Sequence, residues 1–243
     1  MKQAFGPVLA EMGEDLKNLY AAGRDRILAA GFRKIDNAED GKQANLRVTR
    51  DVLWNGAFAD DEVCAEYFGG ILASSRTEDG KDDSSIQYVD VIKSLSSKQL
   101  CLHYLIYNAL NKMLVVTKPD LNVGQSTEIK KCGVWLATIE LLSRYGVNIG
   151  TDFNILFRQG LITEYKTNQF NSGDKALPYA MIKPTTFGVL LYASAHNRID
   201  DWRLFSSTDF GNFETIEPLT VFADSLDELK KMAGMPEGTP TGT

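Results

Sequence analysis

The sequence contains few of the residues that most often carry catalysis or bind metals. Its 243 residues include only three cysteines and two histidines. The cysteines, Cys64, Cys101 and Cys132, are odd in number, and no two of them have C-x-x-C spacing. We interpret Cys64 and Cys101, which fall on apolar helix faces, as buried thiols in a reducing compartment.

Sequence motifs of common enzymes are missing as well. We find no G-x-G-x-x-G, no P-loop, no H-E-x-x-H and no G-x-S-x-G. His103 falls within an apolar helix with Tyr107 one turn further on, and His196 falls near a helix C-terminus, where positive charge is favoured. Both suit structural roles, and neither has metal-ligand spacing with a cysteine. We therefore predict no catalytic residue, no metal site and no cofactor.

The third absence is a long uncharged apolar run. No stretch has the length and apolar character of a membrane span, and no signal peptide is evident. The formal charge is -6 and the hydrophobic fraction is 44%, which is ordinary for a globular protein. We expect a cytoplasmic protein without a transmembrane segment, folded as one large domain or two small ones.

The clearest local signal that is present is a helix start at Ser96. Ser96 and Gln99 have the S-x-x-Q spacing of a capping box, and Leu95 and Leu100 have the spacing of a hydrophobic staple. The helix that follows, residues 96–112, is apolar nearly all round, which indicates a core helix.

Helical periodicity also covers most of the chain before this helix. We predict helices over residues 1–36, 47–58 (with Val48, Val52, Leu53 and Trp54 facing inward), from Asp60 or Asp61 through Leu72, and over 86–94. The stripe on the first helix contains Val8, Met12, Leu16, Leu19, Gly23, Ile27 and Ala30. It indicates packing on the rest of the domain; the alternative is a helix that binds a partner or a membrane surface. Residues 1–114 are thus predicted to form an α-helical bundle.

The pattern changes after residue 115. We predict a short strand at 133–137 (or one helix across 128–145), a helix capped by Thr138, and a helix capped by Thr151. Two strands, through Lys166 and over 177–183, would flank a polar loop at 167–175, followed by a helix from Thr186. This order resembles the end of a winged-helix domain, with the 96–112 helix as its first helix.

The predicted fold class is therefore mainly α: a helical bundle that continues into a winged-helix-like subdomain with a small β-hairpin. The subdomain covers residues 115–206 and shares the 96–112 helix. Residues 207–243 form a C-terminal extension, with a capping box at Ser225 and Glu228. About the last ten residues have nothing to bury, and we expect them to be disordered.

Two segments resemble a known family. Phe68–Ser75, then a polar loop, then Asp90–Ser96 resemble the Abi-alpha (abortive infection alpha) family of bacterial proteins, and the resemblance continues at 48–59, 160–162 and 186–188. The resemblance implies a role in phage defence. The residues themselves favour a binding or sensing module over an enzyme, and the implied partner is a phage or host protein; a homo-oligomer is also possible.

Two polar loops are the candidate partner-binding segments, because function in such proteins concentrates on loops. The first carries Glu78, Asp79, Asp82 and Asp83, and the second carries Asp174 and Lys175. The acidic loop lacks the ligand order of a calcium-binding EF-hand.

A winged helix raises DNA binding as an alternative, through Arg158, Lys166 and Lys175. Residues 119–206 contain nine Lys/Arg and eight Asp/Glu, however, whereas DNA-binding faces concentrate positive charge. A transcription regulator is therefore the second hypothesis.

A magnesium-dependent nuclease is the third hypothesis. Pro119-Asp120 followed by Glu128-Ile129-Lys130 matches the loose pattern P-D…E-x-K, in which the carboxylates hold the metal. That chemistry needs the E-x-K on a buried strand, and the residues before it do not favour one.

Overall fold

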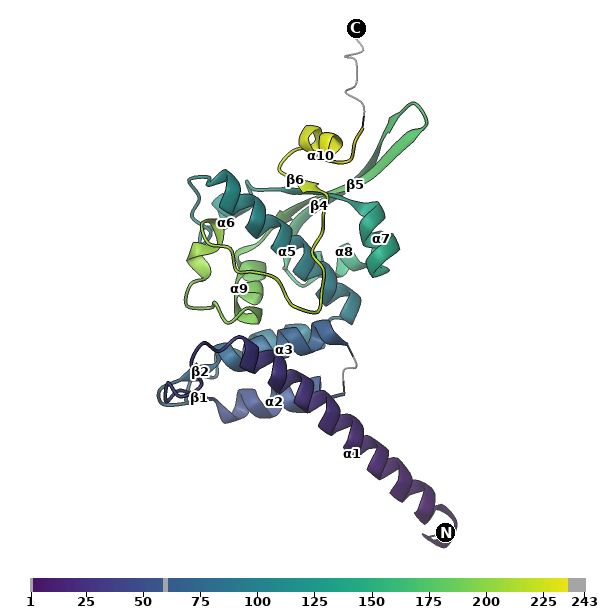
Figure 1. The fold of residues 1–243 in the computed structure, drawn as a ribbon, viewed down its shortest axis with the longest axis vertical. Coiled ribbons are helices and arrows are strands. Elements are labelled where there is room, and N and C mark those ends of the chain that lie inside the picture. Colours follow the sequence, from purple (N-terminus) through teal and green to yellow (C-terminus); the bar gives the residue numbers. More distant parts are fainter. Residues whose placement is uncertain (1, 59–60, 236–243) are drawn as a thin grey trace. The chain divides into compact units, whose positions relative to one another are not determined.

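The computed structural model describes the backbone of residues 2–58 and 61–235 and the side chains of residues 14–58 and 61–235 (Figure 1). The fold is mainly helical, with one small antiparallel sheet. It divides into two compact units. Unit 1 is Met1–Ser94 with Ser194–Asn197, and unit 2 is Leu95–Ala193 with Arg198–Thr243.

Unit 1 is a set of helices joined by a short two-stranded ribbon. Its elements are α1 (Lys2–Arg33), β1 (Gln43–Ala44), α2 (Leu46–Gly56), α3 (Glu62–Ser74), β2 (Arg76–Thr77) and α4 (Ile86–Lys93). Side-chain caps from Asn45 and Asp61 begin α2 and α3. The helices predicted for this part of the chain are therefore present, with ends shifted by a few residues.

Helix α3 is the centre of unit 1, and its glycines allow backbones to meet there. A Cβ added at Gly69 would lie 2.6 Å from the backbone nitrogen of Gly31 in α1. A Cβ at Gly70 would lie 1.9 Å from the carbonyl oxygen of Ala195. The Phe68-Gly69-Gly70 sequence is therefore a packing requirement of α3.

One charge is buried in unit 1. Glu66 is 1% exposed, and its carboxylate contacts both Arg33 and Lys34 at 2.5 Å. Two cations thus compensate a carboxylate that has lost its water.

One orientation predicted in unit 1 is wrong. Trp54 was expected to face inward, and it is 66% exposed. The buried row of α2 is Val48, Val52 and Gly56, spaced by four residues, and Trp54 lies on the opposite side of the helix.

Unit 2 is organised around α5 (Ser97–Thr117). The predicted capping box at Ser96 and Gln99 is confirmed, with bonds of 3.3 Å and 2.9 Å between each side chain and the other residue's backbone N–H. Leu100, Leu102, Tyr104, Leu105, Ile106 and Tyr107 are each fully buried. The packing partners of α5 are α7, α8, β3 and the 3-10 helix η1, so it lies wholly in unit 2, whereas the sequence-based bundle ran to residue 114.

The remaining elements of unit 2 pack around this helix. They are α6 (Ser126–Ile129), β3 (Val134–Ala137), α7 (Thr138–Tyr145), α8 (Ile149–Arg158), β4 (Ile162–Ser172), β5 (Lys175–Pro184), α9 (Thr186–Ala195), η1 (Trp202–Ser206), β6 (Phe222–Ala223) and α10 (Leu226–Met232). The sheet order is β4-β5-β3-β6, and every neighbouring pair is antiparallel.

Three local predictions in unit 2 need correction. The polar loop predicted at 167–175 is strand through Ser172, and the turn is only Gly173-Asp174. This hairpin extends beyond the rest of the unit (Figure 1), so polar residues occupy both of its faces and no apolar alternation marks it. Asn148 caps α8 in place of Thr151, and Thr138 lies inside α7, because the chain enters each helix earlier than its threonine.

The C-terminal extension is an integral part of unit 2. Residues 205–216, which we call the strap, cross α5 without regular structure (Figure 1). Asn111 donates to the carbonyl oxygens of Phe205 and Thr208 at 2.6 and 2.8 Å and accepts from the N–H of Phe210 at 2.9 Å. After the strap, β6 pairs with β3, and α10 covers the sheet through Leu229. The predicted disorder of the last residues concerns positions that lie mainly outside the described ones.

Within residues 2–58 and 61–235, no helix has both the length and the apolar character needed to cross a bilayer.

Candidate functional site

An open apolar pocket lies in unit 1 where the C-terminal end of α1 meets the β1–β2 ribbon. Its volume is about 280 Å³. The lining residues come from five elements and the turn between α1 and β1: Leu28, Gly31, Phe32, Ile35, Ala38, Lys42, Ala44, Thr49, Leu72, Ala73 and Arg76. Several of them are small, so the surrounding helices leave a hollow of the size of one or two apolar side chains.

Charged groups stand at the edge of this pocket. Arg76 pairs with Asp40 and donates to the carbonyl oxygen of Lys42 at 3.3 Å. Lys42 is exposed, and Phe32 is 62% exposed although it is a large aromatic residue. The pocket therefore combines an apolar floor with a cationic edge, and its largest side chain is already at the surface.

The predicted acidic loop adjoins this pocket, because Arg76 both lines the pocket and begins the loop. Asp79 accepts from the hydroxyl of Thr77 and from the N–H of Lys81, both at 3.1 Å. Asp82 accepts from the N–H of Ser84 at 2.9 Å. These bonds form local turns, which fix the course of the loop.

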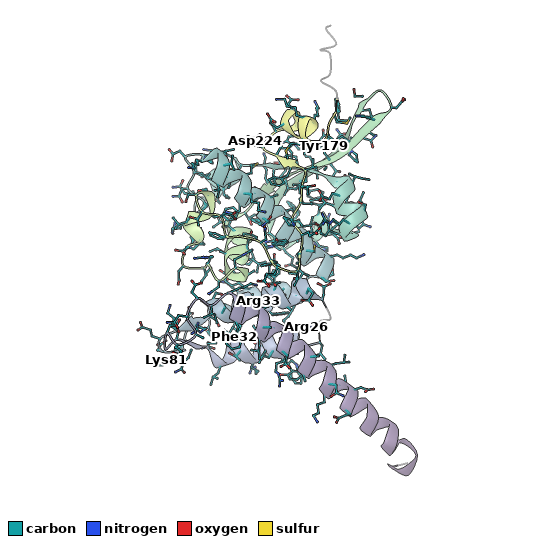
Figure 2. The ribbon with its side chains drawn as sticks, in the orientation of Figure 1. Arg26, Phe32, Arg33, Lys81, Tyr179 and Asp224 are labelled. Atoms are coloured by element: carbon teal, nitrogen blue, oxygen red, sulfur yellow. The ribbon has the colours of Figure 1, made fainter. Side chains whose placement is uncertain are left out.

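Two longer contacts tie the loop to α2. Asp83 pairs with Arg47 at 2.7 Å, and Asn45 donates to the carbonyl oxygen of Gly80 at 3.1 Å. Glu78 is exposed beside them, and Figure 2 labels Lys81 on the loop and Phe32 on α1. Sequence reasoning identified the loop but missed the pocket, whose members are distant in sequence and individually unremarkable.

The second predicted loop lies in unit 2, so the two predicted sets do not belong to one compact unit. Asp174 is at the tip of the β4–β5 hairpin. Lys175 next to it donates to the carbonyl oxygen of Gly234 at 3.2 Å. This lysine therefore helps to hold the residues after α10.

The residues of the DNA alternative lie on α8 and the hairpin, and part of their charge is neutralised. Lys166 and Lys183 each contact Glu164 at 3.0 Å. Hydrogen bonds from Lys166 and Lys183 hold the pKa of the Glu164 carboxyl below its usual value. Arg158 is exposed at the end of α8. The neighbouring Phe157 is 48% exposed and lines a shallow hollow with Asn154, Thr163, Glu164 and Tyr165.

The nuclease motif does not have the geometry that its chemistry requires. Ser126–Ile129 is one helical turn, so Glu128 is on a helix and not on a strand. Glu128 pairs with Lys131 at 2.5 Å, and Asp120 and Lys130 are exposed. Among the described side chains, no group of three or more potential metal ligands occurs.

Burial governs the remaining titratable candidates. It lowers the pKa of His103 to about 3, against a backbone hydrogen bond with Gly188 that raises it. Burial also raises the pKa of the Cys64 thiol to about 12, with a further contribution from Asp61. At neutral pH the imidazole is uncharged and the thiol is protonated, as their predicted structural roles require.

Comparison with known proteins adds no relative. No protein-family model, no curated protein and no solved structure matches the chain significantly.

Proposed function

We propose that this chain is a protein-binding module that acts in bacterial defence against phage, and that it binds its partner through the acidic loop and the adjoining pocket of unit 1. The defence role rests on the resemblance of Phe68–Ser75 and Asp90–Ser96 to the Abi-alpha family. The binding role rests on the structure of unit 1.

The observation that carries the binding role is the position of an open apolar pocket beside a structured acidic loop. A pocket of about 280 Å³ suits an apolar side chain. The loop carboxylates suit basic side chains next to that anchor, and Glu78 contributes charge from an exposed position. The turns at Asp79 and Asp82 hold the loop in one course, which reduces the entropy that binding would cost.

We further infer that residues 95–184 form a winged helix. Support comes from the element order α5-β3-α7-α8-β4-β5 and from the sheet order β4-β5-β3, in which the first strand pairs with the last. In this arrangement α8 occupies the position of the recognition helix, and the β4–β5 hairpin is the wing.

The winged helix favours protein binding over DNA binding. The outward side of α8 presents Phe157 together with Asn154, and Arg158 is its one basic residue in Ile149–Arg158. On the wing, Glu164 neutralises part of the charge of Lys166 and Lys183. Because phosphate neutralisation dominates DNA affinity, we expect only weak, strongly salt-dependent binding to duplex DNA. A tight site-specific complex at physiological salt that is lost in Arg158→Ala would support the transcription-regulator alternative.

The binding proposal is tested by pairing a phage-plaque assay with thermal unfolding. Glu78→Lys should reverse a loop charge, and Phe32→Ser should remove the exposed aromatic edge of the pocket. Both side chains are exposed, so both variants should unfold within about 1–2 °C of the parent. Each should lower phage protection at least tenfold.

Matched controls place the same changes elsewhere on exposed positions. Asp200→Lys reverses an exposed acid in unit 2, and Leu142→Ser removes an exposed apolar side chain from α7. Both should protect as well as the parent. Full protection by Glu78→Lys and by Phe32→Ser, with normal folding, would refute the binding surface; a parent chain that gives no protection would refute the defence role instead.

A further inference from the structure

The N-terminal part of α1 lies outside the packing of unit 1. Residues 14–19 are exposed on every side of the helix, whereas Gly23, Ile27 and Ala30 are buried. In Figure 1, α1 continues beyond α2 and α3. Helices that lack tertiary packing are marginal in water. This part of α1 therefore needs a cover that its own unit does not supply.

The uncovered segment carries the same apolar face that packs inside the unit. Leu16 and Leu19 are 52% and 59% exposed. At 100° per residue they fall on the face of Gly23, Ile27 and Ala30, which meets α2 and α3. At Gly23, a Cβ would lie 1.8 Å from the carbonyl oxygen of Ala57. The intramolecular packing face thus extends past the edge of the unit without a partner.

An exposed aromatic group lies where α1 leaves the unit. Tyr20 and Phe58 have ring centroids 5.7 Å apart, and Trp54 meets Phe58 edge-on at 6.3 Å. Trp54 is 66% exposed and Phe58 is 50% exposed. With Leu16 and Leu19, these three rings form one surface, which we call the α1–α2 apolar surface.

The charges along α1 and α2 match this surface to itself. On α2, exposed Arg50 precedes Trp54 by one turn, and Phe58 follows one turn later. On α1, exposed Glu14 precedes Leu16 and Leu19. A helix laid along α2 in the same direction would place leucines on Trp54 and Phe58 and an acid near Arg50.

Twofold symmetry supplies a helix with that direction. Within unit 1, α1 and α2 run antiparallel, because Gly23 meets Ala57 at one end while Phe32 and Thr49 line the same pocket at the other. A second α1 related by a twofold axis perpendicular to the first runs antiparallel to it, and therefore parallel to α2. We infer that two copies of this chain dimerise through the α1–α2 apolar surface, with Leu16 and Leu19 of each copy on Trp54 and Phe58 of the other.

The test uses the full chain in analytical ultracentrifugation over a range of concentrations. The parent should dimerise, and the double variant Leu16→Glu/Leu19→Glu should raise the dissociation constant at least tenfold, as should Trp54→Glu alone. Helix content should stay the same, because these side chains are exposed. Val116→Glu, at an exposed α5 position in unit 2, is the control and should dimerise like the parent. A parent that stays monomeric up to about 100 μM, or a dimer that tolerates the double variant, would overturn the inference.

Charge exchange tests whether the occupant is a second copy. Glu14→Arg and Arg50→Glu should each weaken dimerisation, because each puts like charges opposite one another twice. An equimolar mixture of the two variants should restore it, since both contacts then become Arg with Glu. Failure of the mixture to recover, when each variant alone is weakened, would exclude the proposed pairing of α1 with α2.

Discussion

Gly31 of α1 and Gly69 of α3 approach so closely that a Cβ on Gly69 would lie 2.6 Å from the backbone nitrogen of Gly31. The Gly69 side also faces the carbonyl oxygen of Ile27 at 2.7 Å. Backbone atoms cannot move aside as a flexible side chain can, so this contact sets the distance between the two helices.

Gly69→Ala should therefore destabilise unit 1 by about 1–3 kcal/mol through overpacking. Gly133→Ala is the matched control, because its Cβ would meet its nearest neighbour at an ordinary 3.6 Å. The control should be neutral or slightly stabilising, since it removes freedom from the unfolded chain. Urea unfolding of both variants measures the difference, and equal stabilities would show that α1 and α3 can separate without cost.

The start and the middle of α5 should differ in their contribution to stability. Ser96→Ala should cost about 1 kcal/mol by removing the cap. Tyr104→Ala should cost about 3–5 kcal/mol, because it leaves a cavity beside Phe213, whose ring stacks on Tyr104 at 4.4 Å. It also removes the hydroxyl that accepts the N–H of Phe213 at 3.1 Å. Thermal unfolding of the two variants would contradict the central position of α5 if both shifts were negligible.

Buried His103 should make the protein sensitive to acid. Its pKa is lowered to about 3 in the folded chain, so between pH 3 and 6.5 the unfolded state binds a proton that the folded state does not. The contribution of His103 to stability is therefore complete above pH 6.5 and falls by about 1.4 kcal/mol for each pH unit below it, down to pH 3.

A variant without the titrating group isolates this effect. His103→Gln should be less stable at pH 7.5 but should lose less stability than the parent between pH 6.5 and 4.5. Denaturant unfolding at several pH values measures both slopes. Parallel slopes for parent and variant would show that His103 takes up its proton in the folded state.

Features with a local cause could be predicted from the sequence. The capping box at Ser96 and Gln99 depends on four consecutive residues, and the left-handed cap at Gly146 depends on one glycine after an apolar run. The antiparallel β4–β5 hairpin was expected for similar reasons. Its length was not, because Thr167–Ser172 is exposed on both faces and lacks the alternation that burial of one face imposes.

Features made by distant residues could not be predicted in this way. The pocket depends on Gly31, Ala38 and Ala73 coming together, and none of them is distinctive in sequence. Trp54 was assigned to the interior because of its hydrophobicity, although the buried row of α2 runs through Val48 and Val52. The acidic loop was identified by its charge, but its attachment to α2 through Arg47 depends on the fold.

The strap has a consequence for the order in which the protein can fold during synthesis. Asn111 emerges from the ribosome long before its partners Phe205 and Phe210, which follow it by 94 and 99 residues, and Tyr104 precedes Phe213 by 109. Until those residues appear, the polar side chains of α5 have no native partners, and burying them unpaired would be costly. The first compact unit likewise includes residues 194–197. Neither unit can therefore complete its native packing co-translationally until most of the chain has been made, so a nascent chain must keep apolar helices exposed and depends on protection from aggregation.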